Sequence, residues 1–260
     1  MSSQDAGRTA REEAFFDALA RQQSDSWWGH KTHAGKRRQV RRAKLIADIL
    51  APVEPETRIL EIGCGAGDFT VFLMEQLPRC RFVGMDISGQ LLELARQRIA
   101  RPDVEFRKGD VQKIDPSLGL FDAVIGASIL HHLDASRALA ALHEALRPGG
   151  KLAFMEPNMR NPQVWLERNV RLIGKALQNT EDETAFHRQQ MSRMLHAAGF
   201  VDVCVTPFDF LHPLVPRALV AVADRLLRML ERVPLIKELA GSLLITASRA
   251  GASDKDGGVP

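Results

Sequence analysis

The residues best suited to chemistry in this sequence stand at the ends of three short apolar segments in the first half of the chain. Glu61 lies in the first segment, which runs into a glycine-rich turn at 63–67. Asp86 and Asp110 end the next two segments. Three carboxylates beside a glycine turn suit a ligand with a ribose, an exocyclic amine and a positive charge. They do not suit a phosphate, which a lysine would have to hold.

The glycine turn reads Gly63-Cys64-Gly65-Ala66-Gly67. This spacing differs from the Gly-x-Gly-x-x-Gly of dinucleotide-binding enzymes. Gly63 ends the strand where a Cβ would crowd the turn, and Gly65 and Gly67 let backbone N–H groups approach a ligand. A helix is expected to open at Asp68, so the unit is a strand, a turn and a helix N-terminus, where an α/β sheet binds a nucleotide-like ligand.

Two adjacent histidines, His131 and His132, follow a fourth apolar segment at 121–127. The unperturbed pKa of histidine suits a general base. Either histidine is a candidate for that role, with His131 favoured because the step from His132 to Leu133 resembles packing. The alternative is that a histidine here only caps the next helix.

Alternating patterns surround these residues and must position them. Strands are expected at 59–62, 82–85, 104–107, 121–127 and 151–155, and helices at 41–50, 68–77, 88–100 and 135–146. Ser88 is expected to cap the helix at 88–100. Such alternation predicts a mostly parallel sheet with right-handed crossovers. The polar residues then share the edge formed by the carboxyl ends of the strands.

Five motifs in this region together resemble the class I S-adenosylmethionine-dependent methyltransferases, of the type 11-like kind that acts on small molecules or lipids. They are Glu61-x-Gly63-x-Gly65-x-Gly67, Asp86, Gly109-Asp110, Phe121-Asp122-Ala123-Val124 and Leu146-Arg147-Pro148-Gly149-Gly150. The resemblance implies an α/β fold with a doubly wound, mostly parallel, seven-stranded Rossmann-like sheet. It also implies an antiparallel last strand, with 201–206 and 242–248 as the closing strands, and helical cap elements.

The resemblance further implies S-adenosylmethionine as cofactor and S-adenosylhomocysteine as product. Asp86 would accept hydrogen bonds from the ribose, and Asp110 with Val111 would hold the adenine. Glu61 would either order the loop or contact the cofactor directly. The full set of expected cofactor-binding residues is Glu61, Gly63, Cys64, Gly65, Gly67, Asp86, Ile87, Asp110, Val111 and Ala127.

The chain divides into a core and several additions. Residues 1–50 are expected to form an N-terminal helical lid. The Rossmann-like core covers 51–206 and 242–249, with a helical insert at 157–185. Residues 207–241 form a helical insertion, because they are longer than the tight hairpin normally found between the last strands. The tail at 250–260 is expected to be disordered.

An N-terminal segment at 26–38 is expected to be a loop, with Trp27, Trp28 and His33 among glycines and basic residues. Either the tryptophans pack a small apolar seam beside a solvated basic face, or the segment closes over the acceptor as a lid. The lid interpretation makes Trp27, Trp28 and His33 substrate-binding candidates. Glu156 and Asn158, just beyond the strand at 151–155, complete the expected substrate-binding set.

The insertion at 207–241 is amphipathic, with arginines among its apolar residues. Three interpretations stay open. It packs on the core or forms a dimer seam, it caps a hydrophobic acceptor, or it rests on a membrane surface.

Composition narrows the class of protein. The net charge of +3 and pI near 8.9 are too mild to argue for nucleic acid by themselves. Cys64, Cys80 and Cys204 are widely spaced, which fits a reducing compartment and shows no metal site. The polar N-terminus is not a signal peptide, and no apolar run is long enough to span a membrane. The expected location is the cytoplasm.

The expected reaction is transfer of a methyl group to a small, hydrophobic or lipid-like acceptor, on oxygen. No Asn-Pro-Pro-Phe type sequence, which in related enzymes marks amine methylation on bases or protein glutamine, follows the strand at 121–127. The alternatives are a nucleic-acid methyltransferase that uses the basic stretch 31–44 and a non-catalytic S-adenosylmethionine-binding subunit. Expected partners are a small-molecule acceptor and not nucleic acid, with the chain as a monomer or homodimer.

Overall fold

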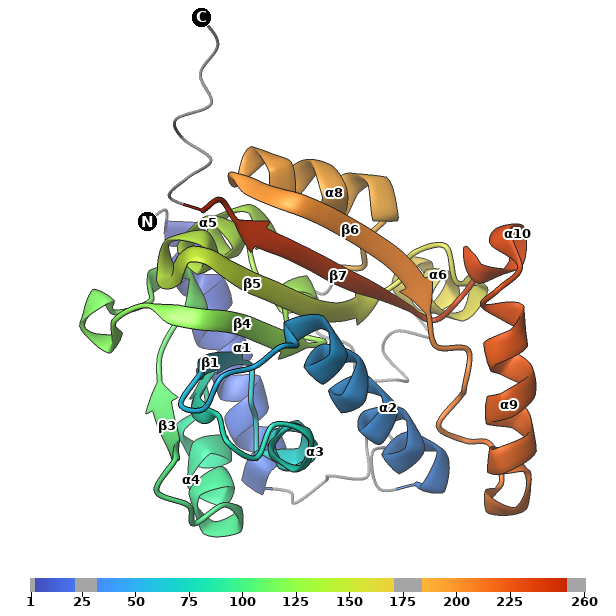
Figure 1. Ribbon diagram of the computed structural model, residues 1–260, viewed down its shortest axis with the longest axis horizontal. Helices are drawn as coiled ribbons and strands as arrows, with labels where there is room; N and C mark the ends of the chain where they lie inside the picture. Colours follow the sequence, from blue (N-terminus) through green and yellow to red (C-terminus); the bar gives the residue numbers. More distant parts are fainter. Residues whose placement is uncertain (1–2, 22–31, 171–183, 252–260) are drawn as a thin grey trace, which may run out of the picture.

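The described part of the chain is built around a central sheet in the computed structural model (Figure 1), which describes residues 3–21, 32–170 and 184–251. Within these residues the sheet has seven strands in the order β3-β2-β1-β4-β5-β7-β6. They are β1 (Arg58–Ile62), β2 (Arg81–Asp86), β3 (Val104–Lys108), β4 (Phe121–Ala127), β5 (Leu146–Pro157), β6 (Phe200–Phe208) and β7 (Ser242–Arg249). Strands β1 to β5 pair in parallel, and β7 runs antiparallel to β5 and β6. The expected doubly wound sheet with an antiparallel last strand is confirmed.

Helices connect the strands, and four of those described begin after a side chain that caps the N-terminus. They are α1 (Ser3–Arg21), α2 (His33–Leu50), α3 (Asp68–Gln76), α4 (Gly89–Arg98), α5 (Ala135–Ala145), α6 (Pro162–Asn169), α8 (Arg188–Ala197), α9 (Val220–Leu230) and α10 (Pro234–Lys237). Ser88 caps α4 as expected, because its Oγ accepts the Leu91 N–H at 3.1 Å. None of the described helices is long and apolar enough to cross a membrane.

The sheet buries apolar side chains on both faces, because alternate strand residues point to opposite sides. Leu60 and Val124 belong to the cluster that packs against α5 and α8. Ile59 and Ile125 belong to the cluster beneath α2, α3 and α4. Helices on both faces leave the carboxyl ends of the strands as the place for a ligand.

Helix α2 is longer than the sequence pattern predicted. Its first turn begins at His33, eight residues before the expected start at Arg41, because the Thr32 hydroxyl caps the helix by accepting the Gly35 N–H at 2.9 Å. Part of the segment expected to be a loop is therefore helix. Trp27, Trp28 and the tail at 252–260 lie outside the described residues.

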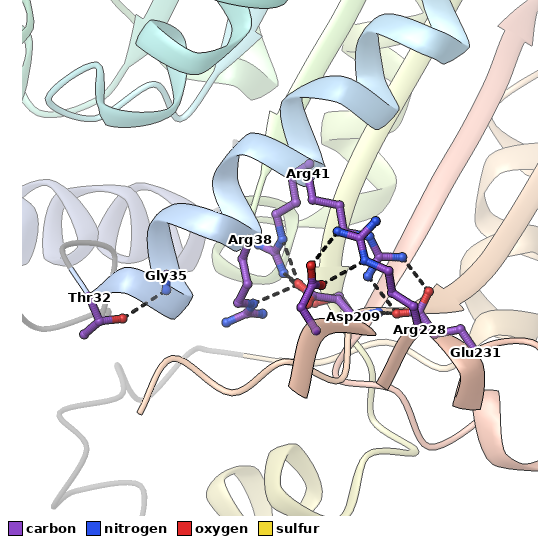
Figure 2. Close-up of polar contacts among 10 residues, drawn as sticks. Thr32, Gly35, Arg38, Arg41, Asp209, Arg228 and Glu231 are labelled. Atoms are coloured by element: carbon purple, nitrogen blue, oxygen red, sulfur yellow. Dashed lines mark hydrogen bonds and ion pairs between the residues drawn. The ribbon is translucent and has the colours of Figure 1, made fainter. Parts of the chain in front are cut away.

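The insertion between β6 and β7 is fastened to α2 by a buried carboxylate (Figure 2). Asp209 Oδ2 accepts hydrogen bonds from Arg38 Nε at 2.9 Å and from Arg42 Nη2 at 2.9 Å. Arg42 also donates to Ser242 Oγ at 2.7 Å. One arginine thus joins α2 to the end of β6 and the start of β7. We call Arg38, Arg42, Asp209 and Ser242 the Asp209 cluster.

Helix α9 lies beside α2 and is held by further ion pairs on the side that faces it (Figures 1 and 2). The Arg41 guanidinium binds Glu231 through both carboxylate oxygens, one of them at 2.7 Å. Asp224 accepts from Arg37 at 2.8 Å and from Arg228 at 2.9 Å. These pairs fix the orientation of α9.

The charges of the Asp209 cluster depend on one another. Burial alone would raise the pKa of Asp209, but the charges of Arg42 and Arg38 outweigh it and the pKa lies below its ordinary value. Burial, with the charge of Arg38, lowers the pKa of Arg42 to about 10, so the guanidinium stays charged at neutral pH. Removing one partner would leave a buried charge without compensation.

A second buried carboxyl lies beneath the glycine turn. Glu61 is 2% exposed, and Thr70 on α3 donates its hydroxyl to Glu61 Oε2 at 2.6 Å. Burial raises the pKa of Glu61 to about 8; the Thr70 hydrogen bond opposes this shift and the charge of Asp86 adds to it. Glu61 therefore holds a proton at neutral pH and ties β1 to α3.

We expect Asp209→Asn to destabilise the fold strongly. The substitution keeps the size of the side chain but leaves Arg38 and Arg42 without their counterion, a loss of roughly 3–5 kcal/mol in the free energy of unfolding. Denaturant unfolding measures it. Glu56→Gln is the matched control, because it breaks the exposed pair with Arg81 and should cost less than about 1 kcal/mol. Equal losses in the two variants would contradict the role given to the cluster.

We expect Glu61 to make stability depend on pH between its unfolded pKa near 4.5 and its folded pKa of about 8. In that window the native state keeps a proton that the unfolded state releases, so stability falls as pH rises, by roughly 2 kcal/mol between pH 6 and pH 8. Glu61→Gln has no proton to release. Its unfolding free energy should fall less over the same range, and parallel pH profiles for the two proteins would refute the assignment.

Candidate active site

A cavity of about 1060 Å³ lies at the carboxyl ends of β1, β2 and β4. Its sheet side is lined by residues from the strand ends and the turns after them, among them Gly63, Asp86, Asp110, Ala127 and His131. Its other side is lined by residues of α1, α2, α6 and the segment after β6. The cavity therefore lies between the strand ends, where sheets of this topology bind ligands, and the added helical elements.

The glycine turn is held against β2 by backbone bonds. The Gly63 N–H donates to Met85 O at 2.8 Å. Gly63 has φ +65°, and a Cβ there would lie 2.6 Å from a side-chain carbon of Ile129, so the position requires glycine. At Gly65, with φ +53°, a Cβ would meet nothing within 4 Å. The turn thus presents open space at Gly65 next to the cavity.

Asp86 closes this turn from the end of β2. Its Oδ2 accepts the Gly65 N–H at 2.8 Å and its Oδ1 accepts the Ser88 N–H at 2.9 Å. Burial raises the pKa of Asp86 against these backbone donors. Each carboxylate oxygen has two lone pairs, so both can accept one further donor from the cavity.

Asp110 offers a second acceptor beyond β3. Its Oδ1 accepts the Gln112 backbone N–H at 2.9 Å and the Gln112 side-chain amide at 3.4 Å. Within the described residues its Oδ2 has no hydrogen-bond partner, and the residue lines the cavity. Asp110 can therefore bind an amine without giving up a structural bond.

His131 is oriented by the buried carboxylate of Glu156. His131 Nδ1 lies 2.7 Å from Glu156 Oε2, and both side chains are almost completely buried. Glu156 Oε1 accepts the backbone N–H groups of Ile129 at 2.9 Å and Leu130 at 2.8 Å. An ionised carboxylate only accepts, so the proton belongs on Nδ1, and Nε2 is the nitrogen that can take a proton.

Helix α1 covers the histidine pair. The ring of Phe16 packs edge-on to His132 with 5.3 Å between centroids, and His132 in turn lies 4.2 Å from His131. Glu12 Oε2 lies 3.2 Å from His132 Nδ1. Lys108 on β3 binds Glu13 at 2.6 Å, which fixes α1 over the strand ends. The helix shields this side of the cavity from water.

The opposite wall comes from α2 and the segment at 209–214. Gln39 and Arg42 of α2 line the cavity beside Asp209. Thr32 Oγ1 donates to Pro213 O at 2.7 Å, so the start of α2 is also tied to this segment. The Asp209 cluster therefore sets the position of this wall.

Cys64 lines the cavity but is unsuited to nucleophilic chemistry. Burial, then the charges of Asp86 and Glu61, raise the pKa of its thiol well above the ordinary value. Among the residues that the structure describes, no group of three or more His, Cys, Asp or Glu side chains could hold a metal ion. The available chemistry is that of carboxylates and histidines.

Most of the residues expected at the cofactor site line this cavity together. They are Gly63, Cys64, Gly65, Asp86, Ile87, Asp110, Val111 and Ala127, with His131 and His132 beside them. Glu61 and Gly67 do not line it. Glu61 bonds Thr70 beneath the turn, and Gly67 starts α3 with φ +77°.

The expected substrate-binding residues are placed differently. Glu156 is 1% exposed and uses both oxygens on His131 and the backbone beside it. Asn158 is also 1% exposed and donates its amide to Glu238 O and Ala240 O. His33 is exposed at the start of α2. None of these three lines the cavity, because strand alternation and local bonds turn Glu156 and Asn158 into the fold.

Sequence reasoning expected a lid at 1–50 and offered a cap at 207–241, but it did not identify which residues of α1, α2 and the 209–214 segment line the cavity. Glu12 and Phe16 stand on an amphipathic pattern that indicates only a buried helix face. Only Asp209 could have been noticed from the sequence, because it is an acidic residue directly after an apolar strand. A carboxylate buried at such a place must have charged or hydrogen-bonding partners. Its arginine partners lie more than 160 residues earlier.

Comparisons with known proteins agree with this geometry. Residues 59–150 match a family model described as a methyltransferase domain. Trans-aconitate 2-methyltransferase of Azoarcus sp. is 34% identical over 119 residues, which are 45% of this chain and 46% of that protein. The ubiquinone/menaquinone biosynthesis C-methyltransferase UbiE of Desulfotalea psychrophila is 27% identical over 56% of this chain and 66% of its own length. The chain thus spans about half the length of the trans-aconitate relative.

A solved structure extends the likeness over most of the fold. The putative methyltransferase of Haloferax volcanii, in its complex with the methyltransferase activator Trm112, superposes with a TM-score of 0.61 at 22% identity. The superposition covers 90% of this chain and 97% of that one. The sheet order, the glycine turn with its strand-end carboxylates and the methyltransferase domain matched at 59–150 make this chain similar to the class I S-adenosylmethionine-dependent methyltransferases.

Proposed function

We propose that the protein is an S-adenosylmethionine-dependent methyltransferase that methylates a small acceptor and releases S-adenosylhomocysteine. The observation that carries this proposal is one cavity lined by Asp86 and Asp110 on one side and by His131 on the other, with Glu156 holding the His131 imidazole from behind. One side suits a nucleoside and the other suits proton transfer, within one shared space.

The residues present fit the cofactor. Asp86 retains acceptor capacity for ribose hydroxyls, and Asp110 Oδ2 has no partner in the described residues and suits the adenine amine. The open space at Gly65 would admit the ligand next to the backbone. Gly63, Cys64 and Ala127 line the same cavity and would hold the methionine end.

Bound there, S-adenosylmethionine supplies a methyl group already activated by its sulfonium. The chain then has to position an acceptor, exclude water and take up a proton where the acceptor carries one. Helix α1 and the Asp209 cluster enclose the cavity. His131, with Nδ1 held by Glu156, is our candidate for the base.

We assign oxygen as the acceptor atom, since a hydroxyl or carboxylic acid needs a base or an anion site beside it. Apolar residues of the outer wall, including Val164, Leu166, Phe210 and Leu214, favour a hydrophobic or lipid-like acceptor. The relatives that act on trans-aconitate and on ubiquinone or menaquinone support a small-molecule acceptor. One of these relatives is a C-methyltransferase. Identification of the methylated product therefore decides whether the acceptor atom is oxygen or carbon.

A nucleic-acid acceptor has less support. Arg37, Arg38, Arg41 and Arg42 of the basic stretch bind the chain's own carboxylates and are less available to phosphates. We place the enzyme in the cytoplasm because its three cysteines are unpaired.

We expect Asp86→Asn to weaken S-adenosylmethionine binding about 10- to 100-fold, because it replaces hydrogen bonds to a charged acceptor. Isothermal titration of the purified full chain measures this affinity. Asp115→Asn, at an exposed turn outside the cavity, is the matched control and should bind like the wild type. No binding by folded wild type, or wild-type affinity in Asp86→Asn, would refute the cofactor site.

We expect His131→Ala to lower kcat by roughly 10²- to 10⁴-fold while S-adenosylmethionine affinity stays near that of the wild type. The assay is donor turnover against phenolic, carboxylate and lipid acceptors. His196→Ala, on the exposed side of α8, controls for loss of a histidine. Glu156→Gln should lower kcat and alter the pH–rate profile, because it removes the carboxylate that holds Nδ1. Unchanged turnover in His131→Ala would exclude it as the base.

A further inference from the structure

Helix α9 and the residues directly before and after it carry apolar side chains on the side that faces away from the protein. Leu219, Val222, Leu226, Met229 and Val233 recur at spacings of three and four residues and therefore form one stripe. All five are exposed, with Leu226 57% and Val222 60% accessible. Leu235 in α10 extends the set and is 85% exposed. We call these six residues the outer face.

The exposure of this stripe is not a consequence of a loosely attached helix. The opposite side of α9 packs Val220 and Leu227 against Ala34 and Leu211. Asp224 and Glu231 on the same element bind arginines of α2. Because both contacts fix the rotation of α9, the outer face is held toward solvent. An apolar stripe fixed in this way marks an interaction surface.

The acidic residues of the insertion are all in ion pairs, whereas several of its arginines have no acidic partner in the described part of the chain. Each acidic residue between 207 and 241 is in an ion pair: Asp209, Asp224, Glu231 and Glu238 all bind arginines. In contrast, Arg217, Arg225 and Arg232 are exposed and have no acidic partner among the described residues. Arg225 and Arg232 stand directly beside Leu226 and Val233. The outer face is therefore apolar with a purely cationic border.

The combination of an apolar stripe and a cationic border favours one kind of binding partner over another. A second copy of the chain would bring the same unpaired arginines toward one another, with no carboxylate left on the face to neutralise them. An anionic lipid surface neutralises the arginines and accepts the apolar stripe at the same time. We propose that the outer face docks the protein on an anionic lipid bilayer.

Two neighbouring features support a lipid surface. Trp165 on α6 is 51% exposed and shares a groove of about 590 Å³ with Leu235 and Leu239; tryptophan is favoured at the boundary between lipid and water. Leu214 is 75% exposed and also lines the large cavity. The cavity wall therefore reaches the surface on the segment that leads into α9, where an apolar acceptor could pass from the bilayer. The docking itself does not depend on the proposed reaction.

Vesicle binding tests the proposal. The full chain is sedimented with phosphatidylcholine vesicles that either contain or lack phosphatidylglycerol, without cofactor or acceptor. We expect binding to the anionic vesicles that weakens with salt, and a fall of at least about tenfold in Leu226→Glu/Met229→Glu, because two carboxylates replace buried apolar contacts. Arg225→Gln/Arg232→Gln should lose the preference for anionic lipid.

Matched controls separate this effect from misfolding. Leu120→Glu places the same charge at another exposed leucine, before β4, and should bind vesicles like the wild type. All variants should keep wild-type circular dichroism and S-adenosylmethionine affinity, since neither face nor border lines the cofactor site. Absence of that affinity in the wild type would count against the proposed function and leave the docking result standing.

Three results would overturn the docking proposal. The first is a wild type that ignores anionic vesicles. The second is equal vesicle binding by Leu226→Glu/Met229→Glu and the wild type. The third is a wild-type dimer in light scattering that this double variant dissociates while vesicles bind neither protein, which would assign the outer face to self-association.

Discussion

The buried carboxylate of Asp209 is the constraint on which the helical half of this protein depends. It lies between two guanidinium groups of α2, and Arg42 continues the contact to Ser242 on β7. The charged state is stabilised because each partner offsets the desolvation of the other. A helix near the N-terminus, the end of β6 and the start of β7 are thereby joined at one point. The cavity wall and the direction of α9 both follow from that junction.

The sheet side of the cavity rests on a different kind of interaction. Backbone N–H groups of the glycine turn and of Ser88 point at the Asp86 carboxylate, so this acid at the cavity is placed by the main chain itself. The geometry therefore needs glycine at Gly63, where Ile129 leaves no room for a Cβ. This half is local in sequence, since strand, turn and helix follow one another directly.

Buried acids in this fold serve distinct purposes according to their donors. Glu61 has one hydroxyl donor and a pKa raised to about 8 by burial, so it acts as a neutral link between β1 and α3. Glu156 accepts two backbone N–H groups and faces His131, so it orders the turn after β4 and fixes the imidazole. Asp209 is kept charged by arginines. The number and charge of the donors, and not burial alone, decide what each carboxyl does.

The sequence by itself determined the sheet, its order of elements and the cluster of Gly63, Asp86, Asp110 and His131, because each depends on patterns within one strand, turn and helix. Only the tertiary structure decided what encloses that cluster. The start of α2 at His33, the pairing of the basic stretch with the insertion and the cover of α1 over His132 join residues far apart in the chain. Local propensity carries no information about such pairings, since the same arginines fit a solvated face, a nucleic acid or a buried carboxylate until the partner is known. The direction of Glu156 was likewise set by its three donors, which only the folded chain brings together.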